Sequence, residues 1–460
     1  MKKTVGLLSL LLVCHTLRSQ QLETKQWTEH QITKGAKGHT IHNTQVFSPD
    51  DQWVVYDTRN HDTHLARTGF VEKVNIRTGE VVTLYSAPDQ ADYGPGVGAA
   101  TYNPAGFQVL FIHGLRNSTA ERPYGMTRRT GVMVDDRQPF KPHFLDARDI
   151  DPPFTPGALR GGTHAHTWSH DGRYIAFTYN DYVLEQRQKH DPSVSDLRVV
   201  GVMAPAGPVR VTPRTDGENH DGDLFSVVVT HVTERPKPGS DEIDKAFDEG
   251  WIGTNGYLRT DGCRQQRAIA FQGNVRDAQG KTVTEVFVVD LPADLTKASP
   301  QAPLEGTSAT RPNPPAGTAQ RRITFTTDRP FPGVQGPRHW LRSSPDGSLI
   351  FFLMNDPNGH AQIYAVSPNG GPIRAVTHHP FSVQTPFNLS PDGSYIAYGA
   401  DNSVWITNIK TGATKRLTPR SSDENRPING VIWSNDGSML AYNRYVSEPA
   451  GQFLQIFVLL

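Results

Sequence analysis

Cysteine is nearly absent from this chain of 460 residues, which contains only Cys14 and Cys263. Cys14 directly follows an N-terminal apolar run, so the remainder of the chain holds a single thiol. One thiol cannot build a disulfide framework, and it is too few for a thiolate zinc site. We therefore expect a protein that is stabilised by its hydrophobic core and not by crosslinks.

An excess of charge of either sign is also lacking, because 46 Lys and Arg balance 46 Asp and Glu. A protein that binds nucleic acid irrespective of sequence needs a basic face, so this class of partner is not expected. After the N-terminus, no stretch has enough apolar residues to cross a membrane as a helix. A Gly-x-Ser-x-Gly segment is absent too, which argues against a hydrolytic serine triad on such an elbow.

The N-terminus has the pattern of a signal peptide. Lys2 and Lys3 precede the apolar run 5–13, which is too short to span a bilayer comfortably but suits a signal-peptide core. We predict cleavage near Ser19, which would leave residues 20–460 as a periplasmic or secreted protein. Lipid anchoring at Cys14 is the alternative, although Val13 is larger than the residue that normally precedes a lipidated cysteine.

A hairpin recurs along the mature chain. Each of six copies combines an apolar strand, a turn that resembles Ser-Pro-Asp-Gly, and a second apolar strand; the copies begin at Phe47, Tyr102, Trp168, Ser344, Ser390 and Trp433. Asp-Gly between apolar alternations is typical of a tight hairpin, whose turn needs a positive φ. Several copies precede a second hairpin, which makes a four-stranded meander. The serines at 344, 390 and 434 lie 46 and 44 residues apart, close to the roughly 40–45 residues of a propeller blade.

These repeats predict an all-β, seven-bladed β-propeller, with six or eight blades as alternatives. The gap between Ser169 and Ser344 is too long for one blade. We therefore place a divergent blade there, built from apolar segments that start at Phe225, Ala268, Val283 and Arg322. Residues 235–250 are expected to form a surface excursion with a capped helix, and the Pro/Ala-rich residues 300–320 a loop. The final repeat has about three strands, so segment 27–33 is expected to supply the fourth and close the ring.

Several segments carry a family resemblance. The Ser-Pro-Asp-Gly blades resemble the TolB-like propeller repeats of exported bacterial proteins. The run 151–181, which contains Arg160-Gly-Gly-Thr-His-Ala-His166, resembles the uncharacterised YidR family, and so do three further segments: Pro238-Gly-Ser-Asp-Glu-Ile243, Glu249-Gly-Trp251 and Pro337-Arg-His-Trp340. This resemblance spans nearly the whole mature chain and implies a propeller, but no activity. More distantly, the architecture is similar to the oligogalacturonate lyases, whose propellers hold a divalent metal with histidines and a glutamine.

Blade geometry predicts where polar side chains meet. The innermost strand of each blade starts at one mouth of the central channel, and the second strand returns to that mouth. Alignment of the repeats places two sets of residues there: His164, His166, Arg338, His339 and Gln384 at strand starts, and His113, Arg116, Tyr179, Asn180 and Asp181 at or beyond the ends of second strands. Because residues i and i+2 of a strand face the same way, His164 and His166 are expected to point together.

The first function class that fits is an exported lyase acting on uronate-containing oligosaccharides. β-Elimination requires a neutralised carboxylate, a base for the proton α to it, and a proton for the leaving oxygen. As catalytic residues we assign His164 or Tyr179 as the base, and Arg338 or a divalent ion as the group that neutralises the carboxylate. A divalent ion, Mn²⁺ or Zn²⁺, would suit a further set: His164, His166, His339 and Gln384. Substrate contacts are expected from His113, Arg116, Asn180 and Asp181.

The second class is a non-catalytic, TolB-like propeller that binds a protein or glycan partner at the same mouth. Each candidate residue also has a purely structural interpretation. Histidines can hydrogen-bond loop carbonyls across blades, Arg338 can form an ion pair, and polar residues at strand ends commonly stabilise turns. The two interpretations differ in whether the side chains are free to meet a ligand.

Overall fold

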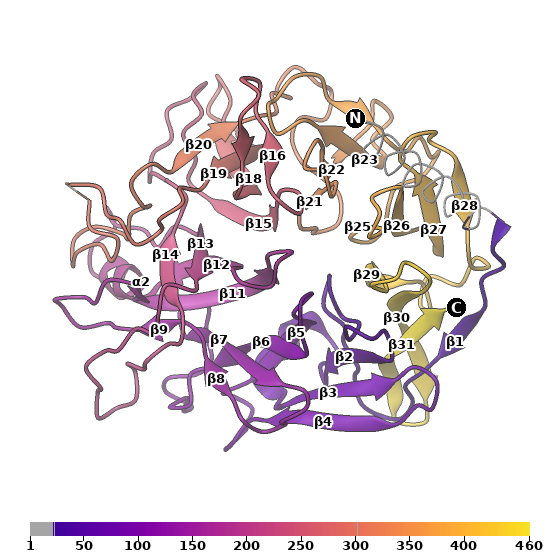
Figure 1. The fold of residues 1–460 in the computed structure, drawn as a ribbon, viewed down its shortest axis with the longest axis horizontal. Helices are drawn as coiled ribbons and strands as arrows, with labels where there is room; N and C mark the ends of the chain where they lie inside the picture. Colours follow the sequence, from indigo (N-terminus) through magenta and orange to yellow (C-terminus); the bar gives the residue numbers. More distant parts are fainter. Residues whose placement is uncertain (1–21, 23, 301) are drawn as a thin grey trace, which may run out of the picture.

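The structure is a computed structural model that describes residues 22, 24–300 and 302–460. Seven antiparallel sheets stand around a central axis, each facing its two neighbours (Figure 1). This confirms the predicted seven-bladed propeller. The predicted signal peptide falls on residues 1–19, which lie outside the described residues. Within the described ranges, no helix is long and apolar enough to cross a membrane.

The blades follow one another in chain order, and the innermost strand comes first in each of blades 2–7. Blade 1 contains β2 (Trp53–Asp57), β3 (Phe70–Asn75) and β4 (Val81–Ser86), and blade 2 contains β5 (Val97–Tyr102), β6 (Gln108–Gly114), β7 (Arg129–Asp135) and β8 (His143–Phe144). Blade 3 contains β11 (Gly161–Trp168), β12 (Ile175–Asp181), β13 (Val199–Ala204) and β14 (Phe225–Val228). Blade 4 contains β15 (Ala246–Trp251), β18 (Ala268–Arg276), β19 (Thr282–Asp290) and β20 (Ala319–Arg322). In blade 1, residues 40–47 take the innermost place through isolated bridges to β2.

Blades 5 to 7 complete the ring. Blade 5 contains β21 (Arg342–Ser343), β22 (Ile350–Asn355), β23 (Ala361–Val366) and β24 (Arg374–Ala375). Blade 6 contains β25 (Asn388–Leu389), β26 (Tyr395–Ala400), β27 (Ser403–Asn408) and β28 (Thr414–Arg416). Blade 7 contains β29 (Ile428–Trp433), β30 (Leu440–Glu448), β31 (Gly451–Leu459) and β1 (Glu29–Gln31). The loops between these strands contain short elements: η1 (Asp62–Arg67), α2 (Tyr182–Gln188), the parallel pair β9 (Ala147–Arg148) and β10 (Ala158–Leu159), and the hairpin of β16 (Tyr257–Leu258) and β17 (Arg264–Gln265).

The ring closes as the sequence predicts, because β1 pairs with the C-terminal strand β31. Glu29 lies opposite Leu459 and Gln31 opposite Phe457 in an antiparallel register. Backbone hydrogen bonds between Thr28 and Leu460 extend this pairing. The first and last described strands therefore share one blade and leave no gap in the ring.

The serine and aspartate of the repeated turn hold it closed. In blade 6, the Ser390 hydroxyl donates to Oδ1 of Asp392 at 2.6 Å and accepts the backbone N–H of Tyr395 at 2.9 Å. The turn at Ser344 makes the same contacts, and Gly393 has the positive φ that was expected, +70°. Since these bonds are local, the turn pattern alone specifies each hairpin.

Hydrophobic cores lie between neighbouring blades. One buried cluster joins Phe351 and Leu353 of blade 5 to Ile396 and Tyr398 of blade 6. Similar clusters join the other blades. Each sheet is thus covered on both faces by its neighbours, which is why the blades require one another for stability.

Blade 4 differs from the sequence-based assignment. Phe225 starts β14, the outer strand of blade 3, and the innermost strand of blade 4 is β15. The helix that we expected near residue 240 does not form, and residues 246–251 are β-strand instead. The local capping pattern misled because β15 pairs with β18, and this long-range pairing outweighs a weak local helix preference.

Bulges interrupt several innermost strands at one position. Non-glycine residues with positive φ occupy these positions: Ala99 (+58°), Ala165 (+58°), Asp248 (+49°) and Asn429 (+58°). The pairing register shifts across each of them in β5, β11, β15 and β29. A bulge adds one residue to a strand and redirects the side chains that follow it.

Candidate functional site

The bulge at Ala165 separates the two histidines that were expected to point together. His164 pairs with Thr178, but the register then skips to Thr167 opposite Ala176. The His166 ring bonds to Thr163, whose side chain lies on the opposite face of β11 from that of His164. His164 contacts the end of β12, whereas the space beside Gly131 of blade 2 is filled by the His166 ring. The extra residue has reversed the alternation.

His164 is held by a polar network at the start of the innermost strand of blade 3. Its Nε2 lies 3.2 Å from Oδ1 of Asn180, which also accepts from Nε of Arg198 at 3.1 Å. The Asn180 amide nitrogen donates to Asp196 at 2.8 Å, so its oxygen faces the ring. Assigned from this network, Nε2 carries the hydrogen and Nδ1 keeps its lone pair.

Positive charge surrounds this imidazole. Burial, followed by the charges of Arg129 and Arg198, holds the pKa of His164 well below its ordinary value of 6.5. His164 is only 3% exposed, so it is neutral at physiological pH. A neutral ring with a free lone pair can accept a proton.

Arg129 and Arg198 have no carboxylate partner within salt-bridge distance in the described part of the chain. Burial is the main cause that lowers the pKa of both guanidinium groups. The Arg129 side chain lies over the Tyr124 ring at 4.6 Å, and its Nε is buried without a hydrogen-bond partner. A partly buried cation without a counter-ion is unfavourable, and a bound anion would offset that cost.

Arg338 lies on the same side of the ring, but its charge is already paired. Its Nη2 and Nε donate to Oδ1 of Asp248 at 2.8 and 3.1 Å, and its guanidinium covers the Trp340 ring at 4.6 Å. Half of the side chain is exposed (52%). The charge of Arg338 contributes to the lowered pKa of Arg198, which places the two cations near each other.

The predicted metal ligands do not form a ligand set. Nδ1 of His339 lies 2.9 Å from the Pro337 carbonyl oxygen, and its Nε2 accepts the Leu353 N–H at 3.0 Å. The side chain of Gln384 is bonded at both ends to Asn402. Among the described residues, no group of three or more His, Cys, Asp or Glu side chains could hold a metal ion. These residues therefore do not fit the predicted Mn²⁺ or Zn²⁺ site.

Tyr179 and Asp181 belong to a buried structural network. The Tyr179 hydroxyl donates to Oδ2 of Asp181 at 3.1 Å and accepts the Arg160 N–H at 3.1 Å. Arg160 also forms an ion pair with Asp181 at 2.7 Å, and Oδ1 of Asp181 caps α2 through the Leu184 N–H. Tyr179 is 1% exposed, and its hydroxyl already donates and accepts hydrogen bonds within the protein.

His113 and Arg116 lie away from His164. Nε2 of His113 contacts the Tyr85 hydroxyl at 2.9 Å, and its ring is fully buried. Arg116 covers the Phe144 ring at 4.5 Å and lines a hollow of about 310 Å³ together with His220. Arg129 and Arg198 do not line this hollow. We call His164, Asn180, Arg129 and Arg198 the His164 cluster. Of the four predicted substrate contacts, only Asn180 belongs to it.

Glu249 is a functional candidate that sequence reasoning missed. Its Oε2 accepts from the Thr178 hydroxyl at 2.9 Å, and Thr178 lies directly across the strand pair from His164. Its Oε1 is buried without a partner, and burial raises the pKa of this carboxyl to about 8. Trp251, two residues after Glu249, could have indicated this strand from the sequence, because Trp168 and Trp433 also end innermost strands. No comparable sequence pattern marked Arg129, which begins β7, or Arg198, which directly precedes β13.

One family and several known proteins resemble this chain. Residues 96–220 match a family described as protein of unknown function (DUF3748). Uncharacterized protein YidR of Escherichia coli K12 is 40% identical over 417 residues, which is 90% of this chain and 94% of the relative. Oligogalacturonate lyase in complex with manganese has a TM-score of 0.53 at 10% identity, covering 95% of this chain and 96% of that one. A structure described as TolB from Agrobacterium tumefaciens has a TM-score of 0.38 at 14% identity, covering 84% and 97%. At such identities, the likeness to the lyase shows the fold alone.

Proposed function

We propose that this chain, which belongs to the YidR family, is an exported lyase for uronate-containing oligosaccharides. Membership of this family implies a propeller but no activity. The observation that carries the proposal is the neutral His164 imidazole near two arginines that, in the described part of the chain, have no carboxylate within salt-bridge distance. A uronate offers both a carboxylate for the arginines and an acidic α-hydrogen for the imidazole.

The chemistry follows from these residues. Arg129 and Arg198 would bind the carboxylate and stabilise the negative charge that develops on it as the α-proton leaves. Nδ1 of His164 would accept that proton. Binding of the anion would also raise the low pKa of His164, because a negative charge favours the protonated ring. The ligand thereby makes its own base stronger.

The leaving oxygen needs a proton as the bond to it breaks and the double bond forms. Glu249 would supply it from the unpartnered Oε1, because its carboxyl keeps its proton at neutral pH. Arg338 would contribute a substrate contact, since it is half exposed although paired with Asp248.

Manganese is present in the lyase that shares the fold, but no step here depends on a metal ion. The arginines would take over the neutralisation of the carboxylate that a divalent ion can provide. Export to the periplasm or the medium is part of the proposal, because the lysine pair and short apolar run predict a signal peptide. Intact-mass measurement of protein from the envelope fraction tests the predicted cleavage near Ser19. A mature chain that starts at a lipidated Cys14 would show that the protein is anchored to a membrane instead.

The decisive experiment is an assay on a panel of uronate oligosaccharides, with ultraviolet absorbance reporting the unsaturated product. Wild-type protein should form this product, and the His164→Gln variant should not. If no uronate yields product while Arg198-dependent binding persists, the protein is the non-catalytic binding propeller. If neither binding nor product is found, the proposed ligand class is wrong.

A further inference from the structure

A hollow of about 260 Å³ lies where the innermost strands of all seven blades run into the turns that follow them, at the end of the strands opposite His164. We call it the turn-face hollow, and its lining includes Gln45, Trp168, Leu341, Arg342, Ile432 and Trp433. Neither His164 nor Arg198 lines it. It is therefore distinct from the site proposed above.

Trp168 is the first sign that this hollow is built for a ligand. Trp433 and Trp251 end their innermost strands as Trp168 does, and their indole N–H groups donate to backbone carbonyls of the preceding blade, Asn388 at 3.2 Å and Thr167 at 3.0 Å. The Trp168 N–H is buried and has no partner among the residues that the structure describes, and Trp168 is only 5% exposed. Folded proteins rarely leave such a donor unpaired unless something else pairs with it.

Two further polar groups in the hollow complement this donor. Oε1 of Gln45 is buried and has no donor among the described residues. Arg342 is fixed by hydrogen bonds from all three guanidinium nitrogens to neutral oxygens of Asn388, Leu341 and Asn43, and no carboxylate lies within salt-bridge distance of it in the described ranges. Burial lowers the pKa of Arg342 to about 10. A cation held rigidly by neutral groups is available to an anion.

The combination defines the chemistry of the ligand. A guanidinium without a carboxylate partner suits a carboxylate, and an indole N–H and an amide oxygen in the lining of the same hollow suit hydroxyl groups, which both accept and donate. Leu341 and Ile432 supply an apolar surface for a C–H face. A volume of about 260 Å³ holds a molecule of monosaccharide size. A sugar acid meets all of these requirements.

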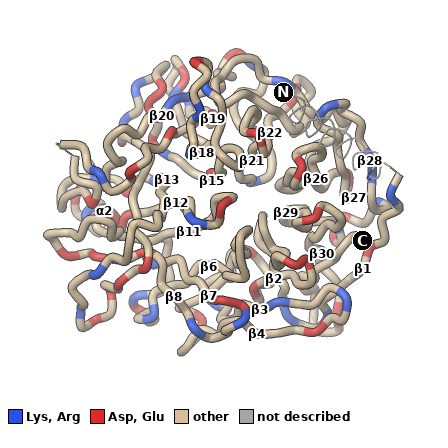
Figure 2. Tube along the Cα trace, viewed as in Figure 1, with Lys and Arg blue, Asp and Glu red and all other residues tan. Residues whose placement is uncertain are grey.

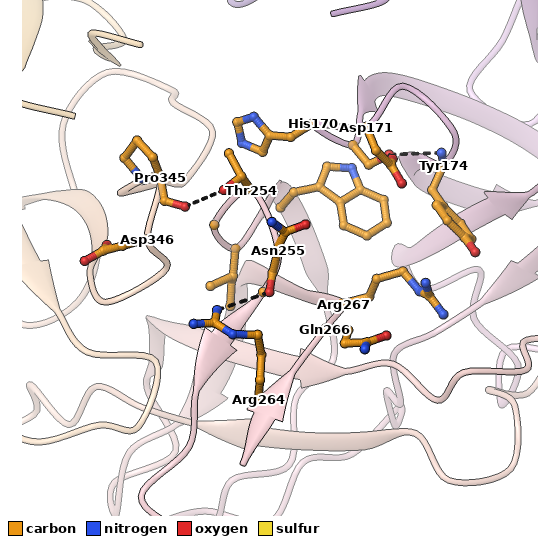
Figure 3. Close-up of a pocket in the computed structure, with 15 residues that line it drawn as sticks. His170, Asp171, Tyr174, Thr254, Asn255, Arg264, Gln266, Arg267, Pro345 and Asp346 are labelled. Carbon is orange, nitrogen blue, oxygen red and sulfur yellow. Dashed lines mark hydrogen bonds between the residues drawn. The ribbon is translucent and has the colours of Figure 1, made fainter. Parts of the chain in front are cut away.

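A second hollow, of about 700 Å³, adjoins the first and shares His170, Trp251, Thr254 and Pro345 with it. Figure 3 shows Gln266 and Arg267 on one side of this outer hollow and Pro345 and Asp346 on the other. The carboxylate of Asp346 is bound to the Ser344 hydroxyl at 2.6 Å. Additional sugar units attached to the one in the turn-face hollow would extend here, toward Arg264 and Arg267.

We propose that the turn-face hollow is a second binding site, which takes the carboxylate-bearing end unit of a short acidic oligosaccharide or a free sugar acid. Arg342 binds the carboxylate, and the Trp168 N–H and Gln45 Oε1 bind hydroxyl groups. The proposal does not depend on lyase activity, because none of these three residues belongs to the His164 cluster.

Calorimetric titration with D-galacturonate, and with D-galactose as its neutral counterpart, tests the proposal. Trp168→Phe should weaken galacturonate binding at least about tenfold, the loss expected for one hydrogen bond to a ligand. Trp433→Phe is the matched control and should change it less than about threefold, since that N–H is used within the protein. Gln45→Glu should weaken binding of galacturonate more than that of galactose, because the new charge repels the carboxylate. This variant decides the matter if Trp168→Phe fails to fold.

Arg198→Gln separates this site from the proposed active site. Galacturonate binding that persists in Arg198→Gln and is lost in Trp168→Phe supports a second site even if no lyase activity is ever found. Binding that is lost in Arg198→Gln but unchanged in Trp168→Phe and Gln45→Glu would overturn it. Absence of measurable binding to wild-type protein would overturn it as well, and ordered water would then explain the unpaired groups.

Discussion

Arg198 and His164 hydrogen-bond to the same atom, Oδ1 of Asn180, at 3.1 and 3.2 Å. The shared acceptor fixes the tautomer of the imidazole and keeps a guanidinium beside it. Base and cation are therefore positioned by one residue, Asn180. Acidic and basic residues are otherwise mixed around the ring (Figure 2), so the charge that favours an anion is local to the channel.

Replacement of Arg198 by Gln should weaken binding of an oligouronide by about 10- to 100-fold. The expected loss is that of a charge-assisted hydrogen bond, about 1.5–3 kcal/mol. Calorimetric titration with a uronate trimer measures it. Arg137→Gln is the matched control, because Arg137 is exposed and pairs with Asp135. Equal affinities for wild type and Arg198→Gln would contradict a role for this arginine.

Replacement of His164 by Gln should remove the base and leave ligand binding nearly intact. We expect kcat to fall by at least about 100-fold with little change in dissociation constant. Because the pKa of His164 in the free protein lies well below 6.5, kcat/KM of the wild type on a uronate should persist as the pH is lowered through 6.5. His143→Gln, at an exposed position, serves as the control. A variant that loses binding and turnover together would make His164 a structural residue.

Glu249 should make stability depend on pH. Burial raises its folded-state pKa from 4.5 to about 8, so between these values the folded state holds a proton that the unfolded state has lost. Its stabilising contribution is thus full below about 4.5 and is lost as the pH rises toward 8. Relative to wild type, Glu249→Gln should gain about 1.4 kcal/mol in unfolding free energy per pH unit between pH 5 and 8.

Urea unfolding of Glu249→Gln at several pH values checks this expectation. Glu285→Gln is the control, because Glu285 is equally buried but accepts from Arg322 and Thr326. It should be destabilised at every pH, because the substitution breaks a buried ion pair. Parallel pH profiles for wild type and Glu249→Gln would show that the Glu249 carboxyl ionises normally.

His339 should prove structural. Its ring bridges Pro337 and Leu353 through both nitrogens, so His339→Ala removes two buried hydrogen bonds and leaves a cavity. The expected loss is about 2–4 kcal/mol of unfolding free energy, whereas His143→Ala should cost little. Chemical denaturation with and without Mn²⁺ measures both effects. A metal-dependent stabilisation of wild type that disappears in His339→Ala would restore the metal hypothesis for this residue.

The blades could be predicted from sequence because their determinants are local. The bonds of Ser390 to Asp392 and to the Tyr395 backbone lie within six consecutive residues. β15 escaped prediction because Phe247, Asp248 and Glu249 do not alternate like a strand with one buried face, and pairing with β18 alone makes them one. Blade 4 was therefore counted correctly but assembled from the wrong segments.

The site was less predictable because it depends on bulges and on contacts between blades. Nothing in the Thr-His-Ala-His pattern shows that Ala165 adopts φ +58° and turns His166 away from His164. Likewise, the backbone partners of His339 lie in segments that only the fold brings together. His164 remained a candidate because its surroundings, unlike those of His339, leave one ring nitrogen free.

The closure of the ring by β1 and β31 has a consequence for biosynthesis. Glu29 pairs across the sheet with Leu459, so blade 7 cannot be completed during translation until β31 has been made. Blades 1 to 6 can form hairpin by hairpin as they emerge, but an unpaired β31 edge persists until the N-terminal segment returns to it. The longest-range contact is thereby the last to form, and until then the nascent protein presents a strand edge that a second copy, or a chaperone, can occupy.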